Sequence, residues 1–198
     1  DYLNRRHADS PYRLRHGGLF LCTFSAVPSK YQWAMNLLGF HGDLERGLAI
    51  LAQAQEKSPY LAEEIVFARY FTQRNLLPSK DAAQHTIDSL AGLHPGNVLV
   101  QYAYTQSLLD RQAQQAAHKN LARFAQQHPS KLQLLPFMLH LQGRMALYQL
   151  EWAASLQPLR QYRRRFAGDL YQADAAFKLG MAYAQQDSMR QARRSWKA

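Results

Sequence analysis

The chain has 198 residues, of which 47% are hydrophobic, and its formal net charge is +10. This length and composition supply enough apolar side chains for a folded core. The longest apolar run, from Gly17 to Val27, falls short of the roughly eighteen residues that a membrane-spanning helix needs. We therefore expect a soluble protein. The sequence does not indicate a compartment. It shows no targeting segment, and its single cysteine cannot form the internal disulfide that would point to an oxidising compartment.

The chain starts with a short basic arm ahead of the first periodic helix. We place this arm at residues 1–16 and a single helical-repeat domain at residues 17–198. The net charge is +3 over residues 1–30, +1 over residues 31–159 and +6 over residues 160–198. The excess of positive charge therefore lies at the two ends of the chain, chiefly in the last helices.

Apolar residues at helical spacing, separated by proline and glycine breakers, predict a chain of helices without strands. In chain order, helices are expected at 17–26, 29–39, 43–57, 59–75, 79–93, 97–110, 113–127, 131–150, 152–166, 169–186 and 188–198. Pro158 lies inside one of these segments, which predicts that this helix either kinks or begins later than residue 152.

One sequence pattern returns at intervals of 34 to 38 residues. Each copy has a small residue, large apolar residues farther along the same helical face, and then a breaker. The small residues are Gly47, Ala83, Ala117, Ser155 and Ala192. Stacked helical hairpins of about 34 residues have this signature, with the small residue in the second helix. We therefore expect an all-α, right-handed α-solenoid of about five helical hairpins.

Two glycines strengthen the comparison with a known repeat. Gly143 and Gly180 each lie twelve residues before the small residue of the next helix. This order resembles the tetratricopeptide repeat, whose glycine lets two helices approach closely. At the same position in the earlier copies stand Met35, Phe71 and Thr105. The hairpins are therefore better described as tetratricopeptide-like.

The segment from Gly17 to Leu51 resembles a particular family of such proteins. Its motifs are Gly17-Gly18-Leu19-Phe20, Ser25, Pro28, Gly39-Phe40, Gly42-Asp43 and Gly47-Leu48. They are similar to those of the tetratricopeptide-like proteins that include the fungal inclusion-body clearance protein and its animal relatives. The resemblance implies a helical scaffold in protein handling or lipid-associated processes, and it brings no catalytic residues. The glycines also have a structural explanation, Gly39 as a helix stop, Gly42 in a turn and Gly47 in a close helix contact.

The first helices of the hairpins should line a concave face that can hold a peptide. The residues predicted on this face are Tyr102, Gln106, His140, Arg144, Phe177 and Met181. Apolar side chains would be buried by the ligand, and Arg144 with His140 would pair with a carboxylate or with backbone oxygens. The alternative is that Phe177 and Met181 only pack under the next helix.

Cations cluster on the second helices near the end of the chain. They include Arg160, Arg163, Arg164, Arg190, Arg194 and Lys197. Such stripes bind phosphates or acidic lipid, and they also occur as ordinary solvated faces. Nucleic acid is not expected as a partner, because aromatic residues are sparse among the cations and no nucleic-acid motif is present.

No pattern typical of catalysis or metal binding occurs in the sequence. The eight histidines are scattered, and Cys22 lies on an apolar helix where we expect it to be buried. We therefore expect no enzyme, no cofactor and no metal. The predicted function is a scaffold that binds a protein or peptide on its concave face. The alternative is attachment to an anionic membrane or polyanion through the arginine-rich helices.

Overall fold

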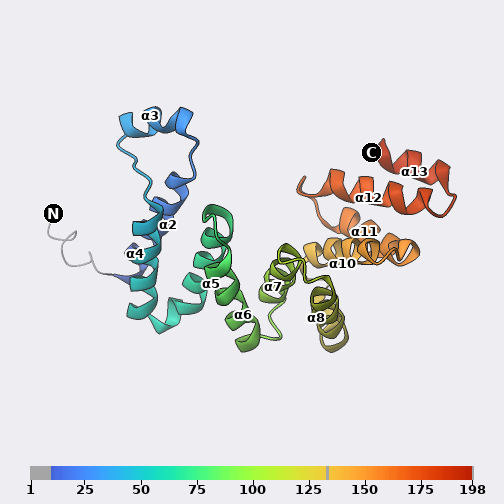
Figure 1. Cartoon of the computed structure of the whole chain (residues 1–198), viewed down its shortest axis with the longest axis horizontal. Helices are drawn as coiled ribbons and strands as arrows, with labels where there is room; N and C mark the ends of the chain where they lie inside the picture. Colours follow the sequence, from blue (N-terminus) through green and yellow to red (C-terminus); the bar gives the residue numbers. More distant parts are fainter. Residues whose placement is uncertain (1–9, 133, 198) are drawn as a thin grey trace. The chain divides into compact units, whose positions relative to one another are not determined.

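A computed structural model of the chain describes residues 10–132 and 134–197, and every regular element in these ranges is a helix (Figure 1). The prediction of an all-α chain is confirmed. In chain order the helices are α2 (Pro11–Ser25), α3 (Ser29–Leu37), α4 (Leu44–Lys57), α5 (Pro59–Leu76), α6 (Asp81–Leu93), α7 (Val98–Asp110), α8 (Gln114–Gln127), α9 (Pro129–Leu132), α10 (Pro136–Tyr148), α11 (Trp152–Arg165), α12 (Gln172–Ala184) and α13 (Met189–Trp196).

Most of these helices begin and end within a few residues of their predicted positions, and the two larger differences both follow from proline. Helix α2 begins at Pro11, because a proline at the first helical position has a helical φ and needs no acceptor for an N–H. Residues 11–16 of the predicted basic arm are therefore helical, and residues 1–9 lie outside the described residues. The helix predicted at 131–150 is divided into α9 and α10, because Pro136 starts a new helix.

Pro158 lies inside α11, which begins at Trp152 all the same. The prediction that this helix begins later is therefore wrong. A proline cannot donate a hydrogen bond to the carbonyl four residues earlier, here that of Ala154. Ala154 is exposed, so water can bind this carbonyl instead.

The chain divides into two compact units, residues 1–89 and 90–198, with the division inside α6. In the first unit, α2 and α5 each pack against α4. Helix α3 has no buried residue, and it stands away from the α2–α4 pair on two connecting loops (Figure 1). The first packed pair is therefore α2 with α4, and α3 is an insertion between them.

Two glycines allow α2 and α4 to pack at close range. A Cβ atom on Gly47 would lie 2.5 Å from Cys22 Sγ and 2.9 Å from the carbonyl oxygen of Gly18. The close helix contact predicted for Gly47 is confirmed, and it depends equally on Gly18. Buried residues around this crossing are Cys22, Leu51, Ala54, Leu61 and Ile65. Burial and the charge of Asp43 raise the pKa of the Cys22 thiol, which keeps it protonated.

The other two glycines of this segment differ in their roles. Gly39 has a φ of +76°, and the N–H groups of Gly39 and Phe40 donate to Asn36 and Met35, so Gly39 ends α3 as predicted. Gly42 was predicted to serve a turn. A Cβ atom there would lie 2.1 Å from the backbone nitrogen of Ser25. Gly42 is therefore needed for a close approach to the end of α2.

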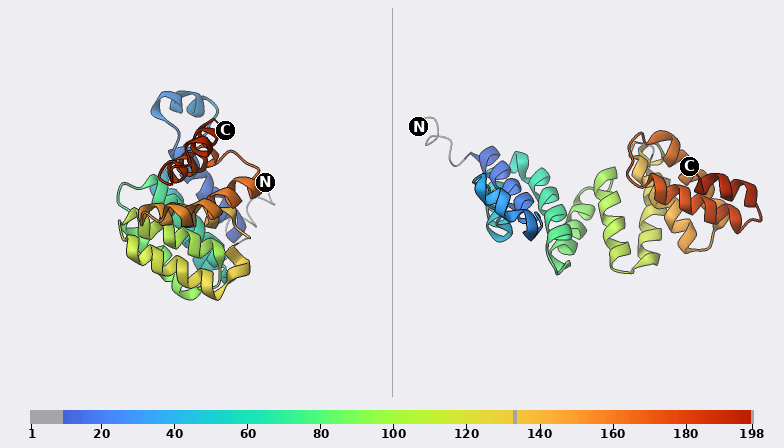
Figure 2. Two further views of the ribbon diagram at one scale, coloured as in Figure 1. Left: turned by 90° about the vertical axis from the view of Figure 1, so that its right-hand side faces the viewer. Right: turned by 90° about the horizontal axis from the view of Figure 1, so that it is seen from above.

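In the second unit, successive helices pack side by side (Figure 2). Helix α7 packs against α8, α10 against α11, α11 against α12 and α12 against α13. Helix α10 also contacts α12, so first helices of neighbouring pairs meet. One core cluster contains Leu121, Phe124 and Met138, and the next contains Leu159 and Tyr162. This order of contacts is typical of helical repeats.

The repeated small residues all lie at helix contacts. Gly47, Ala117, Ser155 and Ala192 are each the fourth residue of α4, α8, α11 and α13, and Ala83 is the third residue of α6. All five are buried. Each of the five therefore lies near the start of a helix, as predicted, with its side chain or backbone buried.

In three helix pairs a glycine of the first helix makes room for a large side chain of the second helix. Cβ atoms on Gly143 and Gly180 would lie 2.4 Å and 2.0 Å from atoms of Leu159 and Trp196. In the first unit the same role belongs to Gly18, where a Cβ would lie 2.8 Å from Leu51. The prediction that placed Met35 at this position is wrong, because the inserted helix α3 breaks the twelve-residue spacing.

Candidate partner-binding surfaces

A row of side chains crosses α7, α10 and α12, the first helices of the pairs in the second unit. Tyr102 and Gln106 on α7 are joined, since the Gln106 amide donates to the Tyr102 hydroxyl over 3.2 Å. The Tyr102 ring lies 6.0 Å from the ring of Phe137 on α10, measured between centroids. The structure therefore brings together two of the predicted residues, although the Gln106 side chain is buried.

His140 lies at the centre of this row, but inside the protein. Its side chain is 1% exposed, and its Nε2 lies 2.6 Å from Oδ2 of Asp174 on α12. The ring of Tyr171 stacks on the imidazole with centroids 4.7 Å apart and planes within 3°. Tyr171 has a φ of +57°, a conformation that non-glycine residues adopt rarely. His140 is therefore enclosed, with Asp174 and Tyr171 against its ring.

The surroundings of His140 favour its neutral form. Burial lowers the pKa of His140, and the positive charges of Arg144 and Lys178 add to this, while the hydrogen bond to Asp174 opposes it. The geometry gives the same answer. Nε2–H donates to the carboxylate, and the buried Nδ1 has no hydrogen-bond partner in the described structure. A proton on Nδ1 would therefore be buried without an acceptor.

Asp174 is held by two donors. Lys178, one turn later on α12, forms an ion pair with Oδ1, and His140 binds Oδ2. Burial alone would raise the pKa of Asp174, but the hydrogen bonds from Lys178 and His140 outweigh it and lower the pKa. The carboxylate is therefore charged, and it neutralises Lys178.

Arg144 lies one turn after His140 on α10 and is partly exposed. Its Nη2 donates to the Tyr148 hydroxyl over 3.2 Å, and its guanidinium lies 5.8 Å from the centre of the Tyr148 ring. No described carboxylate forms an ion pair with Arg144. The row thus contains a positive charge that is oriented by a tyrosine and not neutralised.

Phe177 and Met181 are both on the surface of α12. Their exposed fractions are 57% and 36%. Phe177 lines a pocket of about 640 Å³ together with Arg163 of α11, Trp196 of α13 and other residues of α12 and the loop before it. No ring contact links Phe177 to the residues of the row within the described structure, so Phe177 is not brought together with His140 and Arg144.

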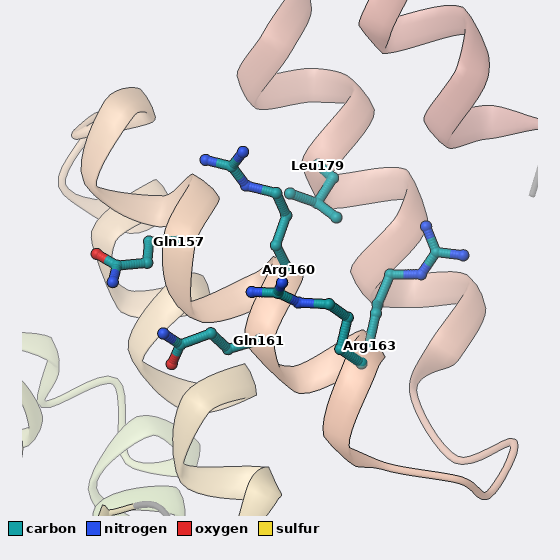
Figure 3. A pocket seen from close by; sticks show the side chains of 6 residues that line it. Gln157, Arg160, Gln161, Arg163 and Leu179 are labelled. Carbon is teal, nitrogen blue, oxygen red and sulfur yellow. The ribbon is translucent and has the colours of Figure 1, made fainter.

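Another pocket, of about 600 Å³, lies along α11. It is lined by Gln157, Arg160, Gln161, Arg163, Arg164 and, from α12, Leu179. Figure 3 shows Arg160 and Arg163 on the side nearer Leu179, with Gln157 and Gln161 on the other side. Three of the six predicted cations therefore meet at one pocket.

The remaining predicted cations are on α13 and at the residue that follows it, Lys197. Arg190, Arg194 and Lys197 are exposed, and none of them is among the residues that line the α11 pocket. In the described part of the chain, none of the six cations forms an ion pair with a carboxylate. The structure thus separates the predicted stripe into a pocket on α11 and an exposed group on α13.

Sequence reasoning missed Asp174, Lys178 and Tyr171. The repeat itself contains the signal for Asp174, which lies 34 residues after His140. Residues one repeat apart occupy equivalent positions on neighbouring first helices, and such positions meet in stacked hairpins. The position of Tyr171 has no comparable signal, because it depends on the loop conformation before α12.

Two features are absent from the part of the chain that the structure describes, a metal-binding cluster and a membrane-spanning helix. Within residues 10–132 and 134–197, no group of three or more His, Cys, Asp and Glu side chains is arranged to hold a metal ion. Over the same residues, no helix combines the length and apolar character needed to cross a bilayer.

The chain matches a known protein family over most of its length. Residues 6–162 match the model of the family described as Iml2/Tetratricopeptide repeat protein 39. This match covers most of the chain and ends inside α11, so Asp174, Phe177 and Met181 lie beyond it. No curated protein and no solved structure matches the chain significantly.

Proposed function

The chain belongs to the Iml2/Tetratricopeptide repeat protein 39 family, and on that premise we propose that it is a non-catalytic scaffold that binds a peptide or helix of a partner protein. The binding surface is the row across α7, α10 and α12. Proteins of tetratricopeptide type generally mediate protein interactions through the first helices of their hairpins. The family thus supports the class of function, and the row supports its location.

The observation that carries this proposal is the state of Arg144. Its guanidinium is oriented by Tyr148, partly exposed and without a carboxylate partner in the described structure. Lys178 and Asp174 neutralise each other, and His140 is uncharged, so Arg144 leaves the row with one positive charge. A partner segment with an acidic side chain complements this charge. Met181 and Tyr102 supply apolar contact on either side.

The structure changes the roles expected for two predicted residues. Gln106 and His140 are buried, so in our proposal they position other groups and do not touch the ligand. Gln106 holds the Tyr102 hydroxyl, and His140 holds Asp174. The contacts proposed for the partner are therefore Tyr102, Arg144, Asp174 and Met181, with Phe177 at the margin.

Selection of peptides from a displayed random library tests this proposal. Peptides retained by the full chain should be enriched in Asp and Glu. Their affinity should fall about tenfold for Arg144→Ala, because a charge-assisted hydrogen bond is lost. Tyr102→Ala should weaken the same peptides. Arg190→Ala, which removes an exposed charge on α13, is the control and should change affinity less than about twofold. Equal binding to wild type and Arg144→Ala would contradict the proposal.

Attachment to an anionic membrane or polyanion is the second candidate. It uses Arg160, Arg163, Arg164, Arg190, Arg194 and Lys197. The observation that favours it is that none of these cations is paired with a described carboxylate. Sedimentation with anionic liposomes across a salt series tests it. Diffuse attachment should disappear as salt rises, because exposed charges are screened.

A further inference from the structure

The pocket on α11 concentrates positive charge without neutralising it. Arg160 and Arg164 are one helical turn apart, and Arg163 lies beside them. Like charges at this spacing repel each other. No carboxylate lines this pocket. Asp169 lines the other pocket, the one that contains Phe177, and Arg163 lines both. The charges therefore favour an anion between them.

The guanidinium groups have few partners in the protein. Arg160 Nε donates to the carbonyl of Leu156 over 3.3 Å, which fixes the direction of its side chain. Arg163 Nε is buried without an acceptor, and no described residue forms an ion pair with Arg163 or Arg164. The terminal N–H groups are thus available to a ligand. Their planar fork suits the oxygens of a phosphate.

Helix position alone does not account for this arrangement. Arg163, Arg164 and Arg165 are in the last turn of α11, where cations interact favourably with the helix dipole. Arg160 lies a turn earlier, and the dipole does not explain why it lines the same pocket as Arg163 and Arg164. A pocket of about 600 Å³ is also larger than a lone phosphate ion needs.

We infer that this pocket binds the phosphate of a phosphorylated serine or threonine in a partner protein. A phosphoserine carries about −1.5 to −2 charges at neutral pH and three acceptor oxygens. Gln157 and Gln161 provide amide donors and acceptors that suit the peptide backbone beside the phosphate. A lipid headgroup has no peptide backbone for these amides to pair with. The inference rests on the proposed function, in that the partner is a protein segment, but it concerns a different surface.

Retention of degenerate peptide libraries on the immobilised full chain tests the inference. One library has a central phosphoserine, and its counterpart has serine at that position. At about 0.15 M salt, the phosphoserine library should be retained at least about tenfold more strongly. The double variant Arg160→Gln/Arg164→Gln should lose this preference, and Arg164→Gln alone should lose part of it. The matched control Arg190→Gln/Arg194→Gln removes the same charge from α13 and should keep the preference.

Three results would overturn the inference. The first is equal retention of the two libraries by the wild-type chain. The second is the same loss in the α13 control, which would mean that only overall charge matters. The third is sedimentation with phosphatidylinositol 4-phosphate vesicles, dependent on Arg160 and Arg164, without any preference for phosphoserine.

Two further measurements keep the outcomes separate. Circular dichroism should show wild-type helix content in each variant, since Arg160 and Arg164 are exposed and no core contact is removed. Binding of acidic peptides that depends on Arg144 should be unchanged in Arg160→Gln/Arg164→Gln. Failure of the phosphate site is thereby distinguished from failure of the proposed row.

Discussion

Replacing Gly42 by alanine is expected to lower the free energy of unfolding of the first unit by about 3 kcal/mol. The new Cβ would lie 2.1 Å from the nitrogen of Ser25 and 2.3 Å from the carbonyl carbon of Phe24. Both are backbone atoms at the end of α2, so no side-chain rotation relieves the overlap. The start of α4 must then separate from α2, although the N–H of Asp43 donates to the carbonyl of Leu21 over 3.2 Å.

Hydrogen exchange of the amides in α2 and α4 measures this effect locally. In Gly42→Ala these amides should exchange faster, while those of α10–α13 keep their wild-type rates. Gly17→Ala is the matched control. Position 17 is inside α2 with no atom within 4 Å of a new Cβ, so alanine should stabilise the helix by about 0.5–1 kcal/mol. Unchanged exchange rates in Gly42→Ala would contradict this prediction, because they would mean that α2 and the start of α4 accommodate the new Cβ without loss of stability.

The second unit should lose stability as the pH falls below about 6.5, the ordinary pKa of histidine. Burial lowers the pKa of His140 in the folded state. Between the two pKa values the unfolded chain binds a proton that the folded chain does not, so folding becomes less favourable. The loss stops once the pH is below the folded pKa, where both states are protonated. Asp174, whose folded pKa is also lowered, adds a further loss at more acidic pH.

The variant His140→Gln isolates this contribution. At pH 7.5 it should be less stable than wild type by about 1–3 kcal/mol, because the stacking with Tyr171 and part of the core contact are lost. Between pH 7 and pH 5 its stability should fall less than that of wild type. His118→Gln, which changes an exposed histidine on α8, should keep the wild-type slope. Denaturant unfolding at a series of pH values provides the measurement. Parallel curves for His140→Gln and wild type would contradict the assignment of neutral His140.

The positions of the helices and their contacts were largely predictable from the repeat. A small side chain is required wherever a second helix meets its neighbour, so Ala117, Ser155 and Ala192 mark helix contacts in the sequence as they do in the structure. Most helix ends were predictable from prolines and glycines, because these residues act on the backbone locally. Pro11 and Pro136 were the exceptions. Helix α2 begins at Pro11, before its predicted start, and α10 begins at Pro136 so soon after α9 that the periodicity continues.

The insertion of α3 was not predictable from the same pattern. Its apolar residues have helical spacing, and nothing in that spacing shows whether a helix packs against others or stays exposed. Counting back from Gly47 therefore led to Met35, although the packed glycine is Gly18. Local periodicity determines where a helix forms. Which other helix it packs against depends on the length of chain between the two helices.

The candidate site was predictable only in part. Tyr102 and Arg144 were found from their helical positions, whereas the burial of His140 follows from three contacts outside its own helix. Repeat length would have identified Asp174 as the partner, because the two residues are one period apart. The exposure of a residue in such a protein is decided by the neighbouring repeat more than by its own.

Helix α3 is a suitable place to attach a label or a tag to this protein. Trp33 is 69% exposed, and no residue of the helix contributes to the core. A cysteine-reactive dye attached to the variant Trp33→Cys would therefore report on encounters near the first unit with little effect on folding. Short affinity tags inserted in place of the helix should be tolerated for the same reason.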